Sequence, residues 1–308
     1  MPLPNFLIVG VPKSGTSSLY YYLGQHPEIY TSPIKEPDFF AFEEGENVKF
    51  DGPGDQQYYD RNLVNSLDAY KALFDGVSNQ KALGEASIVY LYSPNAPNRI
   101  KHLIPNVKLI AILRNPIHRA LSSFAHLRRE GREPLADFSA ALKEEDNRIE
   151  AKWEHLWHYT RVGFYYTQLK RYFTTFPADQ IAVYLFDEFK AQPLEITQKI
   201  FQFLNVDSNF IPDTSLKRNV SGVPKSRTLH TFLKRPNRLK ATLRPLFPAN
   251  WRRTLWTKAM QKNIVPGKPR IPEETRKRLT ELYRDEIMNL QSLIQRDLSK
   301  WLEPDSLQ

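Results

Sequence analysis

Residues 10–16 read GVPKSGT (Gly10-Val11-Pro12-Lys13-Ser14-Gly15-Thr16), between the apolar run FLIV at 6–9 and the helix-compatible segment SSLYYYL at 17–23. This order predicts a strand, a phosphate-binding loop and a helix. The two glycines let backbone amides converge on an anion, the helix N-terminus adds the positive end of its dipole, and Lys13 adds a full charge. We therefore predict that an anionic donor binds at this loop.

The loop departs from the pattern G-x-x-x-x-G-K-[ST] of nucleotide triphosphatases at one decisive position. Thr16 follows the second glycine where that pattern has lysine, and Lys13 lies inside the loop instead. In the usual loop the lysine reaches the terminal phosphates and the next hydroxyl binds Mg²⁺, so the change favours a donor other than ATP and a reaction without a metal. A plain strand-to-helix turn with an incidental lysine is the alternative.

The composition is that of a folded chain. Its 308 residues are 41% hydrophobic and 25% charged, enough for a sizeable core in one large α/β domain. The first apolar run is too short for a signal peptide, and no stretch approaches the roughly 18 apolar residues of a membrane span. The absence of cysteine excludes disulfides and thiolate sites and fits a reducing compartment. We expect a soluble, cytoplasmic protein.

The net charge of +9 is unevenly distributed. Residues 214–272 hold fifteen of the 43 Lys and Arg and none of the 34 Asp and Glu, which leaves −6 on the rest of the chain. Such a block indicates an electrostatic funnel for an anionic ligand, a membrane surface or a polyanionic acceptor. A solvated basic face is the alternative, but the interleaved Pro, Gly and aromatic residues favour the funnel.

Apolar runs and helix-compatible segments alternate along most of the chain. This alternation predicts right-handed crossovers and a P-loop-like parallel sheet flanked by helices, with a ligand crevice at the carboxyl ends of the strands. The predicted strands are 6–9, 82–85, 107–113 and 181–186, and the predicted helices are 17–23, 117–129, 165–176 and 196–204.

The C-terminal part divides into a basic segment and a helix. Residues 231–271 are basic and punctuated by proline, which predicts a lid or an insertion. Residues 273–302 place apolar side chains at helical spacing as far as Trp301. We therefore expect a single domain over 1–308, with its core at 5–230, the basic lid at 231–271 and an amphipathic helix at 272–303.

Charged side chains stand at two predicted strand ends. Glu85 closes the strand beside the first loop, and Arg114 directly follows the strand 107–113. A carboxylate that projects into the crevice suits a general base, and the planar fork of arginine suits a phosphate. The structural alternatives are an ion pair of Glu85 with Lys35 or Lys13, and a capping role for Arg114.

Five segments, in their order along the chain, resemble the sulfotransferase family: GVPKSGTSSLY at 10–20, SPIKEPDFF at 32–40, GEASIVY at 84–90, AILRNPIHRALSSFAH at 111–126 and RDLSKWL at 296–302. The resemblance covers nearly the whole chain and is strongest to bacterial members related to heparan sulfate and N-sulfotransferase domains. It implies a fold like that of nucleotide kinases and 3′-phosphoadenosine 5′-phosphosulfate as the donor, with no metal.

The resemblance also implies residue roles. It makes Glu85 the general base, sets Lys13 beside the bridging oxygen of the donor, and brings Lys35 to the oxygens of the transferring sulfuryl group. An ammonium and backbone N–H groups there stabilise the charge that grows on the leaving phosphate. The implied donor-binding residues are Lys13, Ser14, Gly15, Thr16 and Ser17 at the phosphosulfate, Arg114 and Ser122 at the 3′-phosphate, and Arg218, Lys225 and Arg227 in a late loop over the nucleotide.

The implied acceptor is a hydroxyl, or an amine, of a small molecule or a carbohydrate. Glycosaminoglycan-type members commonly carry lysine after the glutamate, where this chain has Ala86, and this departure argues against a polysaccharide. Peripheral membrane contact through 231–271 is compatible with its charge, and nucleic acid is not an expected partner.

Two other functions remain open on the sequence. A kinase that uses ATP and Mg²⁺ shares the fold, but it needs lysine after the second glycine and a carboxylate for the metal. A nucleic-acid- or membrane-binding protein would use the basic block, and it leaves Glu85 and Arg114 unexplained. His155 and His158 lie three apart without a third ligand at helical spacing, which favours a structural role over a metal site.

Overall fold

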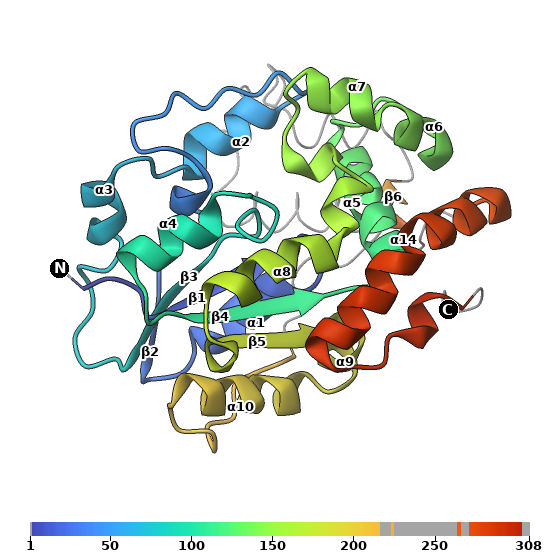
Figure 1. Ribbon diagram of the computed structural model, residues 1–308. Coiled ribbons are helices and arrows are strands. Elements are labelled where there is room, and N and C mark those ends of the chain that lie inside the picture. The colour runs from blue at the N-terminus through green and yellow to red at the C-terminus, as the bar shows by residue number, and fades with distance from the viewer. Residues whose placement is uncertain (1, 216–222, 225–263, 266–270, 304–308) are drawn as a thin grey trace, which may run out of the picture.

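The computed structural model describes residues 2–215, 223–224, 264–265 and 271–303, and its centre is a five-stranded parallel sheet (Figure 1). The chain enters at the middle of this sheet, adds two strands on one side and then crosses to the other side. The spatial order is β2 (Ile29–Thr31), β3 (Ala82–Ala86), β1 (Phe6–Gly10), β4 (Lys108–Leu113) and β5 (Ile181–Leu185). The direction of strand addition therefore changes between β1 and β4, the place where open parallel sheets bind ligands.

The central strands are buried on both faces. Every residue of β1 is buried, as is every residue of β4 after Lys108. Parallel strands covered by helices on both sides need such continuous apolar runs, which explains why FLIVG and KLIAIL form the middle of the sheet. Leu7 pairs with Glu85 on one side and with Leu109 on the other, so the ends of all three strands reach one edge.

Helices cover both faces of the sheet (Figure 1). α1 (Thr16–Leu23) and α10 (Pro193–Leu204) pack on the face that carries Phe6 and Ile8, while α14 (Glu273–Ile294) packs against helices of the opposite layer. The described residues also form the helices α2 (Asp55–Asn62), α3 (Leu67–Ala72), α4 (Ala96–Leu103), α5 (Pro116–Glu130), α6 (Phe138–Lys143), α7 (Glu145–Glu150), α8 (Tyr165–Thr175) and α9 (Phe186–Ala191). Two residue pairs, β6 (Val223–Pro224) and β7 (Ile264–Val265), form an antiparallel ribbon.

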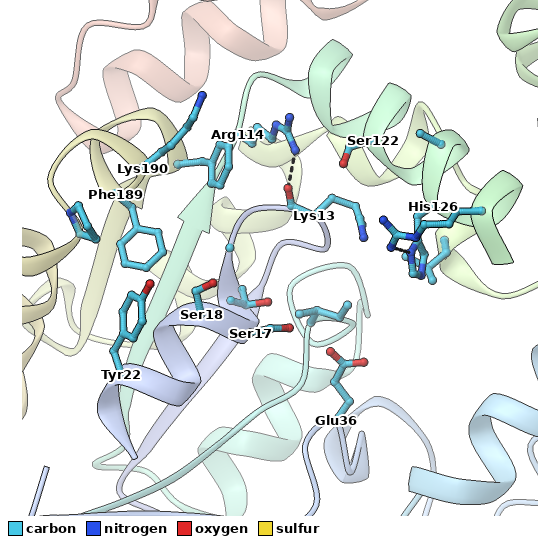
Figure 2. A pocket seen from close by; sticks show the side chains of 18 of the residues that line it. Lys13, Ser17, Ser18, Tyr22, Glu36, Arg114, Ser122, His126, Phe189 and Lys190 are labelled. Atoms are coloured by element: carbon cyan, nitrogen blue, oxygen red, sulfur yellow. Dashed lines mark hydrogen bonds between the residues drawn. The ribbon is translucent and has the colours of Figure 1, made fainter. Parts of the chain in front are cut away.

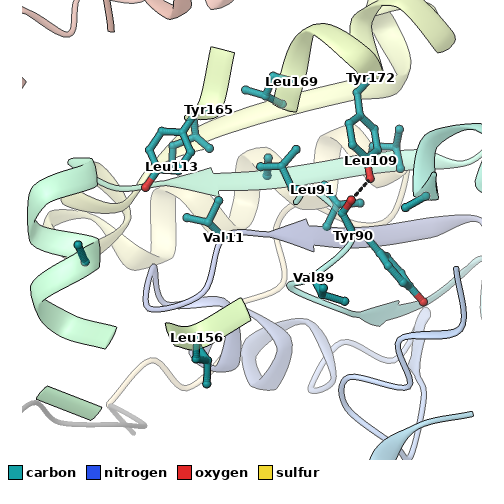
Figure 3. Packing of buried hydrophobic residues seen from close by; sticks show 14 of the residues in the cluster. Val11, Val89, Tyr90, Leu91, Leu109, Leu113, Leu156, Tyr165, Leu169 and Tyr172 are labelled. Carbon is teal, nitrogen blue, oxygen red and sulfur yellow. Dashed lines mark hydrogen bonds between the residues drawn. The ribbon is translucent and has the colours of Figure 1, made fainter. Parts of the chain in front are cut away.

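The core directly behind the carboxyl edge joins the segment after β3 to α8. Figure 3 shows Leu91 packed among side chains of β4 and α8, and the hydroxyl of Tyr172 donates a hydrogen bond to the Tyr90 carbonyl at 2.7 Å. Val11, the first residue after β1, is buried in the same cluster. This packing fixes the backbone from which the loops at the carboxyl edge begin.

The predicted α/β class and parallel sheet are confirmed, with differences at element ends. β2 was not predicted, because a three-residue strand with a Tyr and a Thr has no apolar periodicity. β3 continues one residue past Glu85, to Ala86. β5 ends at Leu185, and Phe186 begins α9 instead of extending the strand.

The C-terminal helix is shorter than predicted. α14 ends at Ile294, and Gln295 adopts the left-handed conformation with φ +52°. The chain then turns back, so that Leu298 and Trp301 are buried from a 3₁₀ turn rather than from the helix. The predicted helical spacing is confirmed as far as Ile294 and is wrong for Leu298 and Trp301, because a left-handed residue that closes the helix leaves no signal in the apolar pattern.

Most of the predicted basic lid lies outside the described residues, apart from Ile264, Val265 and Ile271. Arg218, Lys225 and Arg227 also lie outside them. Among the helices of the described part, none combines the length and the apolar content that crossing a bilayer requires.

Candidate active site

The loop after β1 needs a glycine at position 15, for both its backbone angle and the space beside it. Gly15 has φ +87°, in the left-handed region that favours glycine, and a Cβ there would lie 3.1 Å from the ring of Phe189. α1 begins at the next residue, Thr16, so the first amides of the helix stand at the carboxyl edge of the sheet. The predicted order of strand, loop and helix is confirmed.

A cavity of about 460 Å³ lies over this loop (Figure 2). Six predicted donor-binding residues line it, and they come from the loop, from α1, from the end of β4 and from α5. These six are Lys13, Gly15, Thr16, Ser17, Arg114 and Ser122. The sheet edge therefore brings together residues that lie more than a hundred positions apart in the chain.

Lys13 projects into the cavity from a left-handed backbone position, φ +68° (Figure 2). Its pKa is lowered to about 7, chiefly by burial and also by the positive charges of Arg129 and Arg114, while the Glu36 carboxylate acts in the opposite direction. Three cations thus converge on one cavity, which costs free energy unless an anion is bound. The site is electrostatically built for a negatively charged ligand.

Arg114, directly after β4, is held in place by a hydrogen bond to the loop after β1. One guanidinium N–H donates to the Lys13 carbonyl at 2.7 Å, and the guanidinium lies 4.7 Å from the centre of the Phe186 ring. The side chain is buried, and desolvation lowers its pKa. Ser122 lines the same cavity from α5, so the pair expected at a phosphate is assembled.

Ser14 is also at the loop but is not part of the cavity wall. Its side chain is fully buried, and its Oγ has no hydrogen-bond partner among the described residues. A buried hydroxyl without a partner costs free energy, and a ligand oxygen close to the loop would supply the missing partner. This orphaned hydroxyl and the three converging cations both fit a phosphosulfate at the loop.

The expectation that Glu85 projects into the crevice is wrong. Its side chain is fully buried, and its carboxylate accepts hydrogen bonds from Tyr70 at 3.3 Å and Ser87 at 2.8 Å. Burial raises the pKa of Glu85 to about 7. The reason is strand geometry: β3 continues to Ala86, so Glu85 is an interior strand residue whose side chain stands perpendicular to the sheet.

The glutamate that does line the cavity is Glu36, in the loop after β2. Figure 2 shows its carboxylate directed into the cavity, and its charge acts on Lys13. Lys35, predicted to meet the sulfuryl oxygens, is absent from the cavity wall and instead forms an ion pair with Glu36. The segment KEPDFF therefore supplies an acid to the cavity, Glu36, and not the predicted cation Lys35.

The far end of α5 adds residues that the sequence interpretation missed. His126 and Arg129 line the cavity together with Ser122 and Ala125. These four residues are spaced i, i+3, i+4 and i+7, the spacing of one helix face, and this spacing after Ser122 was a usable signal. The imidazole of His126 lies 2.8 Å from the Arg129 guanidinium.

The opposite end of the cavity is aromatic. Tyr22, Phe186 and Phe189 line it, and the Tyr22 and Phe189 rings are 6.0 Å apart. Lys190 borders the same end (Figure 2). Flat apolar walls next to a cation suit a purine with an attached phosphate.

Of the two histidines singled out by spacing, His155 is buried and His158 is half-buried, and each is hydrogen-bonded to a tyrosine. Nδ1 of His155 lies 3.1 Å from the Tyr59 hydroxyl, and Nδ1 of His158 lies 2.9 Å from the Tyr92 hydroxyl. Burial lowers the pKa of each to about 4. Within the described ranges, no three His, Cys, Asp or Glu side chains gather closely enough to hold a metal ion.

Comparison with known proteins agrees with this geometry. A sequence model described as a sulfotransferase domain matches residues 3–227. The crystal structure of a sulfotransferase from Alicyclobacillus acidocaldarius is 34% identical, with a TM-score of 0.78 over 98% of this chain and 100% of that one.

Curated relatives match over a smaller part. Human bifunctional heparan sulfate N-deacetylase/N-sulfotransferase 2 is 29% identical over 219 residues, which are 66% of this chain and 22% of that protein. Membrane-associated sulfotransferase kil1 of Dictyostelium discoideum is 35% identical over 156 residues, 48% of this chain and 29% of that protein. The chain thus spans less than a third of the length of these relatives. With the family match covering most of its length, the chain belongs to the sulfotransferase domain family.

Proposed function

We propose that the protein transfers a sulfuryl group from 3′-phosphoadenosine 5′-phosphosulfate to a hydroxyl or amine of an acceptor. The observation that carries this proposal is the placement of Lys13 and Glu36. One cavity holds a lysine in a phosphate-type loop and a carboxylate from a separate loop (Figure 2). Family membership and the three converging cations support the same reaction.

The donor would meet this cavity in three places. The loop residues and Ser14 would hold the phosphosulfate, and Arg114 with Ser122 would hold the 3′-phosphate. The aromatic end would take the adenine against Tyr22 and Phe189. This assignment gives the orphaned Ser14 hydroxyl a partner, and the bound anion would favour the charged form of Lys13.

The general base in this proposal is Glu36, which replaces Glu85 in that role. The acceptor oxygen or nitrogen attacks sulfur as the bond from sulfur to the bridging phosphate oxygen breaks. Glu36 takes the acceptor proton, while Lys13 stabilises the charge on the departing phosphate. A base must lie within hydrogen-bond reach of the proton it takes, and of the two glutamates it is Glu36 that lines the cavity.

The acceptor side of the cavity is mixed in character. Ile88 and Leu156 give it apolar surface, and His126 with Arg129 gives it a cationic one. The relatives named for heparan sulfate N-sulfation and the mixed wall favour a sugar or small-molecule acceptor. Ala86, which follows Glu85 within β3, is fully buried in the core and does not line the cavity, so its side chain would not contact the acceptor.

Calorimetric titration tests the donor. We expect 3′-phosphoadenosine 5′-phosphate (PAP), the desulfated product, to bind more tightly than ATP with Mg²⁺, because no carboxylate cluster for the metal stands at this cavity among the described residues. Tighter binding of ATP with Mg²⁺ would overturn the proposal in favour of a kinase. Mass spectrometry of a panel of hydroxyl and amine acceptors incubated with the donor then identifies the acceptor class.

A further inference from the structure

Both carboxylate oxygens of Glu36 are engaged. The Lys35 ammonium contacts Oε1, and the hydroxyl of Tyr58, on α2, donates a hydrogen bond to Oε2. Tyr58 lies twenty-two residues further along the chain and, like Glu36, lines the cavity. The carboxylate is therefore held by its sequence neighbour Lys35 and by Tyr58 from a separate helix.

The backbone of Glu36 by itself does not determine the direction of its carboxylate. Its N–H donates to the Ala86 carbonyl at 2.9 Å, and its φ of +64° is an unusual, left-handed value for a residue with a side chain. These features fix the Cα but leave the rotatable bonds of a glutamate free. A contact at the carboxylate itself is needed to hold it in one position.

Tyr58 is well placed to supply that contact, because its own position is fixed. Its ring meets the ring of Tyr59 edge to face at 5.6 Å, and Tyr59 is buried against His155. The first residue of α2, Asp55, accepts hydrogen bonds from the Trp157 indole at 2.9 Å and from Arg132. α2 is thus anchored to the segment that follows α7, and this anchoring fixes the backbone that carries Tyr58.

We propose that Tyr58 is a positioning residue for the general base. Its O–H donates to Oε2 of Glu36 and holds the carboxylate toward the acceptor while leaving lone pairs for the acceptor proton. Tyr58 acts through Glu36 and does not touch the reacting atoms. This inference rests on the proposed function and adds to it a residue that the sequence motifs do not contain.

Kinetics give the first test, with Tyr58→Phe compared with Tyr166→Phe, a half-buried tyrosine on α8 outside the cavity. Loss of a hydrogen bond to a charged group should lower kcat about 10- to 100-fold. KM for the donor and PAP affinity should stay within about twofold, since Lys13 and Arg114 are untouched. Tyr166→Phe should keep full activity. An unchanged kcat in Tyr58→Phe, or a loss only in donor KM, would overturn the proposal.

A double-mutant cycle tests whether the effect passes through Glu36. In a Glu36→Gln background, the added Tyr58→Phe should cost less than about twofold, because the base is already absent. A full second loss would mean that Tyr58 contacts the acceptor directly and would refute a positioning role. If Glu36→Gln itself keeps full activity, the assigned base is wrong, and that outcome is distinct from a failure of Tyr58 alone.

A third measurement needs no turnover. In protein labelled with ¹³C at the tyrosine Cζ, the resonance missing from Tyr58→Phe identifies Tyr58. That resonance should shift in Glu36→Gln, since its hydrogen-bond acceptor changes from a carboxylate to an amide, and should stay in place in Glu85→Gln. The contact is absent if Glu36→Gln leaves the resonance unmoved, whatever reaction the protein catalyses.

Discussion

Two glutamates near the carboxyl edge of the sheet, Glu85 on β3 and Glu36 in the loop after β2, have opposite surroundings. Glu85 is enclosed by tyrosines and Ser87 within the core, whereas Glu36 lines the cavity and acts electrostatically on Lys13. The two are nevertheless linked: Ser87 donates to Glu85 and accepts from the Asp38 amide at 3.0 Å. A fully buried acid thus supports the loop that presents the acid of the cavity.

This difference shows that position along a strand decides the role of an acid. A residue inside a strand points into one of the helical layers, and only a residue past the end can reach the ligand. Glu85 keeps a function in this arrangement, as part of the scaffold under residues 35–38. The following experiments break or sharpen the comparison between these two carboxylates.

The largest difference is expected from paired substitutions. Glu36→Gln should lower kcat by roughly 10² to 10⁴, the usual contribution of a general base, with the melting temperature unchanged. Glu85→Gln should retain most of kcat, since the amide still accepts from Ser87. Steady-state kinetics and thermal denaturation of both variants measure this. A larger loss of kcat in Glu85→Gln at native stability would return the role of base to Glu85.

Lys13→Ala and Arg114→Ala test the side of the cavity that faces Glu36. Removing the Lys13 ammonium should lower kcat by roughly 10² to 10³, because it stabilises charge that develops only in the transition state. Arg114→Ala should mainly weaken PAP binding, by about tenfold or more, since its charge meets a group that does not react. Turnover and calorimetry separate the two effects. Equal loss of folded protein in both variants would contradict these roles.

Ser87→Ala tests the link between the two acids. It removes the donor to Glu85 and the acceptor of the Asp38 amide, and both atoms lie in the buried core. We expect a loss of about 1–3 kcal/mol in the free energy of unfolding, measured by urea denaturation. Ser139→Ala, on α6 away from the cavity, serves as the control. A stability equal to that of the parent would show that Glu85 does not support the loop.

The smallest expected effect is the uptake of protons when PAP binds. Because the pKa of Lys13 is lowered to about 7 in the free protein and a bound anion restores the charged form, PAP binding should take up about half a proton at pH 7 and about one at pH 8. Affinity should therefore fall as pH rises from 7 to 9. Calorimetry in buffers of different ionisation enthalpy measures the uptake.

The same measurement distinguishes the two glutamates. Glu36 is one of the charges that raise the pKa of Lys13, so Glu36→Gln should increase the uptake at pH 7. Glu85→Gln should leave it unchanged, and Lys13→Ala should abolish it. An uptake that responds to Glu85 and not to Glu36 would reverse the assignment of the two environments.

Sequence patterns predicted the central strands, the loop and the helix that follows β4 because these depend on local features. Continuous apolar runs mark β1 and β4, and Gly15 with Lys13 marks the loop. The same patterns gave no indication that β3 extends to Ala86, and a one-residue difference in strand length moved Glu85 from the crevice to the core.

The amino-acid order by itself thus determined the fold class, the strand–loop–helix unit at residues 6–23 and the family, since these follow from spacing within short segments. Tertiary structure alone decided which acid faces Lys13 and that Tyr58 reaches Glu36 from α2. The physical reason is that these relations join segments brought together by sheet order and by packing of the core. No local pattern encodes the distance between a side chain and a residue on another element.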